Sequence, residues 1–300
     1  MLNRLIINNY RKFKSVDVSL NQFNLLVGGN NTGKTSFLEA AYIALNPTPY
    51  TLYNIAMNRI YYKKDVLNFD YTSEVYDGMF YNSANNIKIN DINLVGHIVK
   101  SPGRSVFEGV LNNKPFRLNG LHAPDGYTLT PLLLNNNFST FDIDFYKVGF
   151  DQEDFKLIND TLKCFNNVDM ILFSDGYEPV IVYNSNYVPL HNYGLGLRRF
   201  VYLLLAIYHS RNNVLMCDEF DLGISPLIAK NLYKTLFKLA IKYNVQLLFT
   251  EHSSDFIEAF LIEEYFDKIS IIRFRDNQIK TFSAEFVERV RTNMGVDIRI

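Results

Sequence analysis

The sequence predicts an α/β protein in which helices flank a mostly parallel central sheet. Three short apolar runs carry this prediction, at residues 23–27, 214–217 and 245–250. Each run has the length and continuous hydrophobicity of a strand that is buried on both faces. The first two runs are followed by longer segments with apolar residues at helical spacing. Strands that alternate with helices are typical of parallel sheets.

A small antiparallel lobe is expected at the N-terminus. Residues 2–8 and 14–20 are typical of the two strands of a hairpin, because apolar side chains at Val16, Val18 and Leu20 alternate with polar ones. The segment between them, Asn9-Tyr10-Arg11-Lys12-Phe13-Lys14, is expected to be a loop.

The loop Gly28-Gly29-Asn30-Asn31-Thr32-Gly33-Lys34-Thr35-Ser36 joins the first apolar run to a helix. It fits the pattern G-x-x-x-x-G-K-[ST], in which glycines let backbone N–H groups surround phosphate oxygens. Lys34 would supply a positive charge for the β- and γ-phosphates, and the Thr35 hydroxyl could ligate Mg²⁺. The alternative is a glycine turn that ends by chance in Gly-Lys-Thr. Because a strand precedes the loop and a helix follows it, a nucleoside-triphosphate site is the stronger interpretation.

Residues 51–186 differ in character from the rest of the chain. They are rich in Tyr, Phe and Asn, and two short pieces, 87–90 and 106–110, alternate as half-buried strands do. Residues 151–166 are predicted to form an amphipathic helix with Asp151 as its N-cap. We therefore predict an α+β insertion of meander strands and one helix, which divides an ATP-site domain into residues 1–50 and 187–300.

The second apolar run ends in Asp218 and Glu219. An acidic pair at the carboxyl end of a buried strand is the pattern that P-loop enzymes use for a metal ligand and a base. Asp218 would hold Mg²⁺, directly or through water, and Glu219 would orient and deprotonate the attacking water. Many strands end in acids, so the pair becomes specific only through the phosphate loop in the same chain. A long helix then follows to about residue 243, with Ile228, Leu232, Leu236 and Ile241 expected in the core.

The third run ends in Glu251-His252-Ser253-Ser254. A lone histidine is usually a structural residue, but His252 would lie at the carboxyl end of a strand beside the nucleotide, where it could bond a γ-phosphate. The tail is expected to add strands at 269–274 and 279–282, with a turn at 276–277, and a helix from Glu285.

Composition limits the other functions. The formal net charge of −1 gives no overall basic field for nucleic acid, although a local patch or a partner could still bind it. The only two cysteines, Cys164 and Cys217, are expected to be reduced thiols in a cytoplasmic protein. We expect no signal peptide, and the most apolar stretch, 200–208, is too short to span a bilayer.

The ordered motifs resemble an ABC-type ATPase head of the SMC, RecF and overcoming-lysogenization-defect (OLD) class. The resemblance covers residues 1–50 and 187–300. Five segments match: Asn-Tyr-Arg-Lys-Phe at 9–13, the loop at 28–35, the Gly194/Gly196 segment, Asp218-Glu219 with Gly-x-x-Pro after it, and Thr250-Glu251-His252-Ser253. Within the class, the chain is most similar to stand-alone ATPases related to OLD nucleases, many of which act in antiviral defence.

The resemblance implies a role for each matched residue. Residues 28–36 and Arg11 would contact ATP, although spacing alone favours a solvated turn for Arg11. Lys34, Glu219 and His252 would be catalytic, while Thr35 and Asp218 would bind Mg²⁺. Asn192, Gly194 and Gly196 would cap the γ-phosphate of a second subunit, so that ATP lies between two heads in a head-to-tail dimer or larger assembly.

The chain departs from its relatives in three places. The transporter signature Leu-Ser-Gly-Gly-Gln is absent, since Asn192-Tyr193-Gly194-Leu195-Gly196 keeps glycines but has no serine. Ser225 stands where relatives usually have histidine before the proline. We expect no Toprim-like nuclease after the histidine motif, so that a nuclease output would come from a separately encoded effector.

Two hypotheses remain, and a third is weaker. The chain would be an ATP-hydrolysing head that dimerises and gates an effector or a nucleic-acid transaction, in defence or DNA repair. Alternatively, it would be a nucleotide-dependent assembly scaffold with negligible turnover. A transporter cassette would need a membrane partner and the missing serine.

Overall fold

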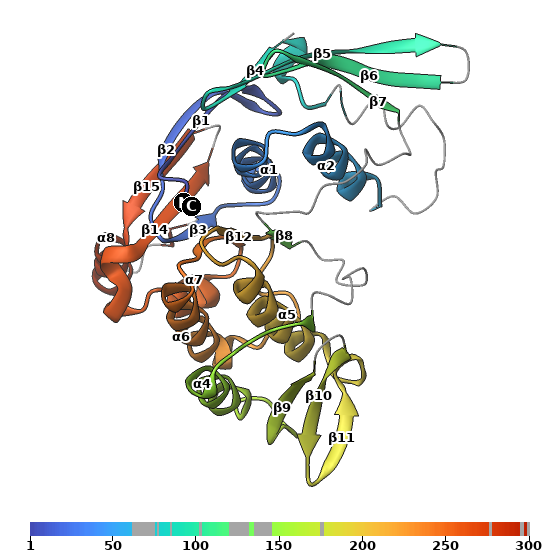
Figure 1. Cartoon of the computed structure of the whole chain (residues 1–300). Coiled ribbons are helices and arrows are strands. Elements are labelled where there is room, and N and C mark those ends of the chain that lie inside the picture. The colour runs from blue at the N-terminus through green and yellow to red at the C-terminus, as the bar shows by residue number, and fades with distance from the viewer. Residues whose placement is uncertain are drawn as a thin grey trace.

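The computed structural model describes residues 1–61, 76, 78–84, 86–101, 104–119, 132–134, 146–174, 177–275, 278–294 and 297–298. The predicted turn at 276–277 lies outside these residues. A six-stranded sheet crosses the middle of the molecule, in the order β15-β14-β3-β13-β12-β8 (Figure 1). Its strands are β3 (Phe23–Val27), β8 (Leu132–Leu134), β12 (Val214–Cys217), β13 (Gln246–Glu251), β14 (Ile269–Arg275) and β15 (Gln278–Ser283). All neighbouring pairs are parallel except β14 with β15, which confirms the predicted mostly parallel sheet.

A second sheet is antiparallel throughout and follows the order β2-β1-β4-β5-β6-β7. Its strands are β1 (Arg4–Tyr10), β2 (Phe13–Ser19), β4 (Asn86–Ile89), β5 (Ile92–Ser101), β6 (Arg104–Leu111) and β7 (Lys114–Asn119). The expected loop at 9–14 is wrong in extent, because Tyr10 pairs with Phe13 and leaves only Arg11 and Lys12 as the turn. The strands predicted within 51–186 also extend the N-terminal hairpin, since β4 pairs directly with β1. The division of the chain into domains stays a prediction.

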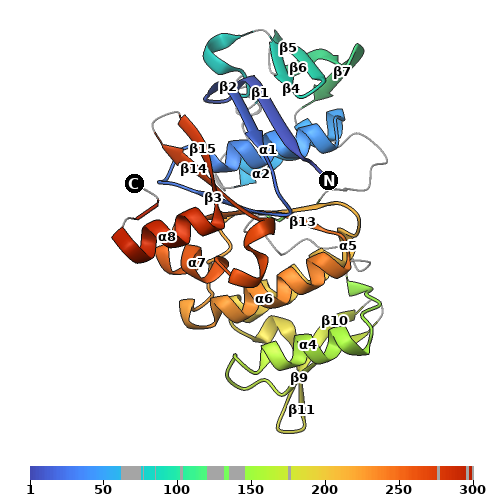
Figure 2. The same cartoon turned by 90° about the vertical axis from the view of Figure 1, so that its left-hand side faces the viewer.

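Helices cover both faces of the central sheet. The helices of the described residues are α1 (Lys34–Leu45), α2 (Pro49–Tyr61), α4 (Gln152–Leu162), α5 (Leu195–His209), α6 (Pro226–Lys242), α7 (Ser254–Phe260) and α8 (Ala284–Met294), with 3₁₀ turns η1 (Tyr81–Ser83), η4 (Leu190–Asn192) and η5 (Glu263–Lys268). Helices α1 and α2 lie between the two sheets, and α5, α6 and α7 lie on the opposite face (Figures 1 and 2). A small antiparallel sheet of β9 (Met170–Ser174), β10 (Tyr177–Tyr183) and β11 (Asn186–Pro189) lies beyond α4 and α5. None of the helices in the described residues has the length and hydrophobicity needed to cross a membrane.

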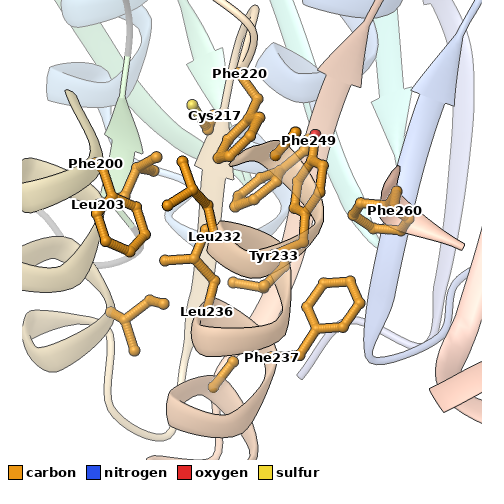
Figure 3. Packing of buried hydrophobic residues seen from close by; sticks show 14 of the residues in the cluster. Phe200, Leu203, Cys217, Phe220, Leu232, Tyr233, Leu236, Phe237, Phe249 and Phe260 are labelled. Carbon is orange, nitrogen blue, oxygen red and sulfur yellow. The ribbon is translucent and has the colours of Figure 1, made fainter. Parts of the chain in front are cut away.

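The central sheet separates two hydrophobic cores because successive side chains of its strands point to opposite faces. Leu25 and Phe249 enter the core shared with α5 and α6, whereas Leu26 and Leu248 enter the core shared with α1. In the first core, Phe220 stacks on Tyr233 with ring centroids 4.2 Å apart, immediately below the end of β12 (Figure 3). This aromatic packing holds the loop after the acidic pair against α6.

Two local predictions were wrong. The helix that begins after Asp151 ends at Leu162 rather than near residue 166, although Asp151 does form a capping box with Asp154. Ile241 is exposed, because the end of α6 turns that position away from the sheet, whereas Leu232 and Leu236 are buried as expected. Cys164 and Cys217 are both free thiols, as predicted.

Candidate nucleotide-binding site

The glycine-rich loop lies between β3 and α1, at the carboxyl edge of the central sheet. Gly28 has a φ of 144°, and a Cβ there would lie 2.4 Å from the Phe274 carbonyl oxygen on β14. Gly33 has a φ of 111°, and a Cβ there would lie 2.8 Å from the ring of Phe13. Only glycine accommodates both the positive φ and these close neighbours. The two glycines therefore hold the loop against the sheet on one side and the N-terminal hairpin on the other.

Lys34 begins α1 and is 5% exposed. Its ammonium donates to the carbonyl oxygens of Gly28 and Gly29, both at 2.8 Å. Burial lowers the pKa of Lys34 to about 8, while the carboxylates of Asp218 and Glu219 act in the opposite direction. Lys34 is therefore a buried cation within reach of phosphate oxygens on the loop, and its charge depends on nearby anions.

Asp218 connects the phosphate loop to the second half of the chain. The Thr35 hydroxyl donates to Asp218 Oδ2 at 2.8 Å, and the Thr250 hydroxyl donates to Asp218 Oδ1 at 2.6 Å. The Glu219 backbone N–H in turn donates to Thr250 Oγ1 at 2.8 Å. Three distant segments thus meet at one carboxylate. Thr250 lies in the matched segment 250–253, but the sequence predicts no role for its side chain in the site.

Arg199 is a second residue that the sequence did not reveal as part of the site. It is fully buried on α5, and its Nη2 donates to the backbone carbonyl of Asp218 at 2.6 Å and to that of Glu219. Glu219 has a φ of 54°, which is uncommon for a residue other than glycine. Arg199 therefore holds the backbone on both sides of Glu219, whose conformation is unusual.

His252 lies beside the phosphate-loop lysine, with 3.4 Å between its Nδ1 and Lys34 Nζ. The preceding residue, Glu251, is fully buried and accepts a hydrogen bond from the Tyr233 hydroxyl at 3.2 Å. Burial, together with the charge of Asp221, raises the pKa of Glu251 well above its usual range. The strand tip thus places His252 at the edge of the predicted phosphate site.

The hairpin turn places Arg11 and Lys12 differently. Arg11 lies at a φ of 54°, and its Nε pairs with Glu39 of α1 at 3.3 Å. Both side chains of this ion pair are largely buried, so Arg11 is not in a solvated turn. Its contact with nucleotide stays a prediction. Lys12 is the residue that reaches the phosphate loop, where its ammonium contacts Asn31.

The two glycines of the signature segment have different surroundings. Gly194 is the N-cap of α5, and a Cβ there would meet nothing within 4 Å. A Cβ on Gly196 would lie 2.2 Å from the Gly223 carbonyl oxygen, so α5 packs directly on the loop after the acidic pair. Asn192, which we expected to act across a dimer, is exposed in the η4 turn.

Known proteins resemble this chain in sequence and in fold. The AAA ATPase domain family matches residues 1–101. A second AAA domain family, whose description names an AbiEii toxin and type IV TA systems, matches residues 122–258. The DNA replication and repair protein RecF of Glaesserella parasuis serovar 5 is 55% identical over 42 residues, and that of Vibrio vulnificus is 51% identical over 43. These local matches cover 14% of this chain and 12% of each RecF chain.

The similarity in fold covers much more of the chain. An SMC head solved with the C-terminal winged-helix domain of ScpA aligns with 96% of this chain and 99% of its own, at a TM-score of 0.52 and 12% identity. The chain therefore has the fold of an SMC-type ATPase head, and the matches to two AAA domain families agree with this fold. A second SMC head, solved with a ScpA domain derived from Pyrococcus furiosus, covers 98% of this chain and 99% of its own, at a TM-score of 0.50 and 11% identity.

The donor set of this head fits magnesium. Mg²⁺ in nucleotide sites is usually held by one or two carboxylates and a hydroxyl, with phosphates and water as its other ligands. Asp218 and Thr35 supply such a pair at 2.8 Å from each other. Within the described ranges no group of three or more His, Cys, Asp and Glu side chains could form an all-protein metal site. Asp218 and Thr35 would hold Mg²⁺ together with the phosphates of a bound nucleotide.

Proposed function

We propose that this head binds ATP with Mg²⁺, hydrolyses it, and dimerises head-to-tail around the nucleotide. The ATP-driven assembly would gate an effector protein or a nucleic-acid transaction. The observation that carries the proposal is the hydrogen bond between Thr35 and Asp218, because it brings the phosphate loop and the acidic pair to one metal position. Without that contact, the phosphate loop and the acidic pair would be two separate motifs, and neither alone would indicate a site for ATP hydrolysis.

Hydrolysis requires a base, a metal and stabilisation of phosphate charge. In this proposal, Thr35 and Asp218 hold Mg²⁺ and Lys34 neutralises the β- and γ-phosphates. Glu219 orients and deprotonates the attacking water, and His252 contacts the γ-phosphate. The short distances among these residues support a common site. Their roles are carried over from the resemblance.

Dimerisation is supported by the surface beside the signature segment. Two apolar side chains beside the signature segment are exposed, Leu195 by 38% and Leu222 by 36%, and Leu227 in the first turn of α6 is exposed by 94%. Leu195 packs beside Gly223, so Leu195 and Leu222 belong to adjoining parts of one surface. Exposed apolar side chains that lie together mark interaction sites. A second copy that covers them would also place its nucleotide over the open space at Gly194.

The partner and the process follow from the resemblance alone. We propose a separately encoded effector, such as a nuclease, and a role in antiviral defence or DNA repair like that of OLD- and RecF-related ATPases. Two SMC heads of similar fold were solved with ScpA domains, so protein partners do bind heads of this fold. Nucleic acid remains a further partner to test. Because both cysteines are free thiols, we place the protein in the cytoplasm.

The Glu219→Gln variant tests this function. Its mass in solution is measured with and without ATP and Mg²⁺ beside the wild-type protein, and phosphate release is followed in parallel. We expect Glu219→Gln to bind ATP and accumulate as a stable dimer while phosphate release stops. Lys34→Ala, as a matched control, should stay monomeric because it cannot hold the nucleotide.

A wild-type protein that does not bind ATP would refute the proposal. A wild-type protein that dimerises on ATP without turnover, with Glu219→Gln indistinguishable from it, would instead identify a nucleotide-dependent scaffold.

A further inference from the structure

The turn of the N-terminal hairpin is pinned to the phosphate loop. Tyr10 pairs with Phe13 across the two-residue turn, and the Arg11 backbone N–H donates to the Met79 carbonyl at 2.7 Å. Phe13 is buried against Gly33 of the loop. The position of the turn is therefore fixed by packing and by backbone hydrogen bonds, so the side chain at its tip has a defined place.

Lys12 is that side chain. A Cβ on Gly33 would lie 3.0 Å from Lys12 Cδ, so the aliphatic part of Lys12 runs along the loop. Its ammonium reaches Asn31, where it contacts the backbone oxygen and lies 3.4 Å from Oδ1. In the described part of the chain no carboxylate forms an ion pair with Lys12. The positive charge of Lys12 is thus directed at the loop and matched there only by neutral oxygens.

Arg11 differs from Lys12 in this respect, because Glu39 already neutralises it inside the lobe. Lys34 resembles Lys12, since its ammonium also donates to carbonyl oxygens of the loop. The ammonium groups of Lys12 and Lys34 both contact this short loop and repel each other. An anion bound between them would offset this repulsion. Phosphate oxygens form stronger, charge-assisted hydrogen bonds than the carbonyls that now accept from these groups.

We propose that Lys12 is a second phosphate-binding cation of the site, which contacts the phosphate chain of a nucleotide held by residues 28–36. The inference deepens the proposed function and rests on it. It adds to the site a residue of the hairpin turn that lies outside the phosphate loop at 28–36 and for which the sequence predicts no role.

The test measures the affinity for ADP and for a non-hydrolysable ATP analogue, each with Mg²⁺, by calorimetry. Lys12→Gln keeps a donor for Asn31 but removes the charge, whereas Lys12→Arg keeps the charge. Lys14→Gln is the matched control, because Lys14 is an exposed lysine of the same hairpin. We expect Lys12→Gln to weaken binding of the ATP analogue about tenfold, the effect of one charge-assisted hydrogen bond. Lys12→Arg should restore most of this affinity, and Lys14→Gln should match the wild type.

The thermal midpoint of the nucleotide-free variants separates phosphate binding from a structural role. Lys12→Gln should unfold at the wild-type temperature. If Lys12 only holds the loop in shape, Lys12→Gln would bind nucleotide as tightly as the wild type, or would lose affinity together with thermal stability, and the inference would be overturned. Failure of the wild-type protein to bind either nucleotide would refute the proposed function instead.

Discussion

The Thr35 hydroxyl and the Asp218 carboxylate lie 2.8 Å apart although 183 positions separate them in the chain. They meet because β3 and β12 are both parallel neighbours of β13, so that their carboxyl ends reach the same edge of the sheet. This edge is where ligands bind in open parallel sheets. Five predictions follow from the residues that surround it.

Asp218→Asn should lower the rate of ATP hydrolysis at least about 100-fold, because an amide is a poor ligand for Mg²⁺. Binding of ATP in the presence of a chelator should change much less. Phosphate release and calorimetry with and without Mg²⁺ measure both effects. Asp160→Asn, at an exposed position on α4, is the control and should behave as the wild type. Equal loss of affinity with and without the metal would contradict the assigned role.

Arg199→Met should lower the free energy of unfolding by about 2 kcal/mol, because the carbonyl oxygens of Asp218 and Glu219 lose the donor that the buried arginine supplies. Hydrolysis should fall as well, since Glu219 would no longer be held in its unusual backbone conformation. Urea unfolding and phosphate release check the two effects. Arg289→Met, on the exposed face of α8, should shift the free energy of unfolding by no more than about 0.5 kcal/mol. A stable and active Arg199→Met protein would show that the acidic pair needs no such support.

The two signature glycines should respond differently to alanine. Gly196→Ala should destabilise the fold by about 2 kcal/mol, because its Cβ would collide with the backbone of Gly223. Gly194→Ala should leave stability unchanged, because its Cβ enters open space. In the Glu219→Gln background, Gly194→Ala should nevertheless weaken the ATP-dependent dimer. Analytical ultracentrifugation measures that loss, and a dimer of undiminished stability would place the interface elsewhere.

Leu227→Asp should weaken the ATP-dependent dimer at least about tenfold without changing the affinity for ATP, since it places a charge on the proposed interface. Ile241→Asp supplies the matched control, because Ile241 is also an exposed apolar residue of α6 but lies at its other end. Sedimentation of the Glu219→Gln protein that carries each change separates them. If both variants dimerise equally well, the assignment of the interface to the Leu227 end of α6 is wrong.

The affinity for ATP should fall as the pH rises above about 8. Burial lowers the pKa of Lys34 to about 8, so the free protein loses this charge above that pH, whereas bound phosphates raise the pKa again. Binding should therefore take up a proton between the two pKa values. The free energy of unfolding of the free protein changes in the opposite direction and rises with pH over this range. Because the unfolded lysine keeps its proton up to about pH 10.5, the cost of burying the charge is relieved between pH 8 and that value.

Calorimetry in buffers with different ionisation enthalpies near pH 8 measures the proton uptake directly. Titrations from pH 7 to 9.5 give the slope of affinity. A binding enthalpy that does not depend on the buffer, together with a constant affinity over this range, would show that Lys34 keeps its charge in the free protein.

Much of the site could be predicted because its motifs are contiguous. The phosphate loop contains its own glycines, lysine and hydroxyl, and an acidic pair that follows a buried strand must lie at the sheet edge. The same holds for His252, which follows β13 directly. In each case neighbouring residues supply both the functional groups and the local backbone conformation. The parallel arrangement of the strands then brings these groups to one edge of the sheet.

Residues that act through distant contacts could not be recognised. Arg199 has the sequence context of a solvated helix start, and only the packing of α5 under β12 buries it against two carbonyls. Likewise, no local feature of the sequence predicts the hydrogen bond that Thr250 donates to Asp218. At the hairpin turn, the backbone conformation directs Arg11 inward to Glu39 and Lys12 toward the phosphate loop, a choice that spacing does not contain.

By itself, the sequence determined the class of fold, the phosphate loop and the acidic pair, because strand hydrophobicity and loop chemistry depend on adjacent residues. Only the tertiary structure decided that β4 continues the N-terminal hairpin and that α5 supports the acidic pair. It also decided that Lys12 lies on the phosphate loop. These relationships depend on strand register and on packing between segments far apart in the chain, and no local pattern encodes them.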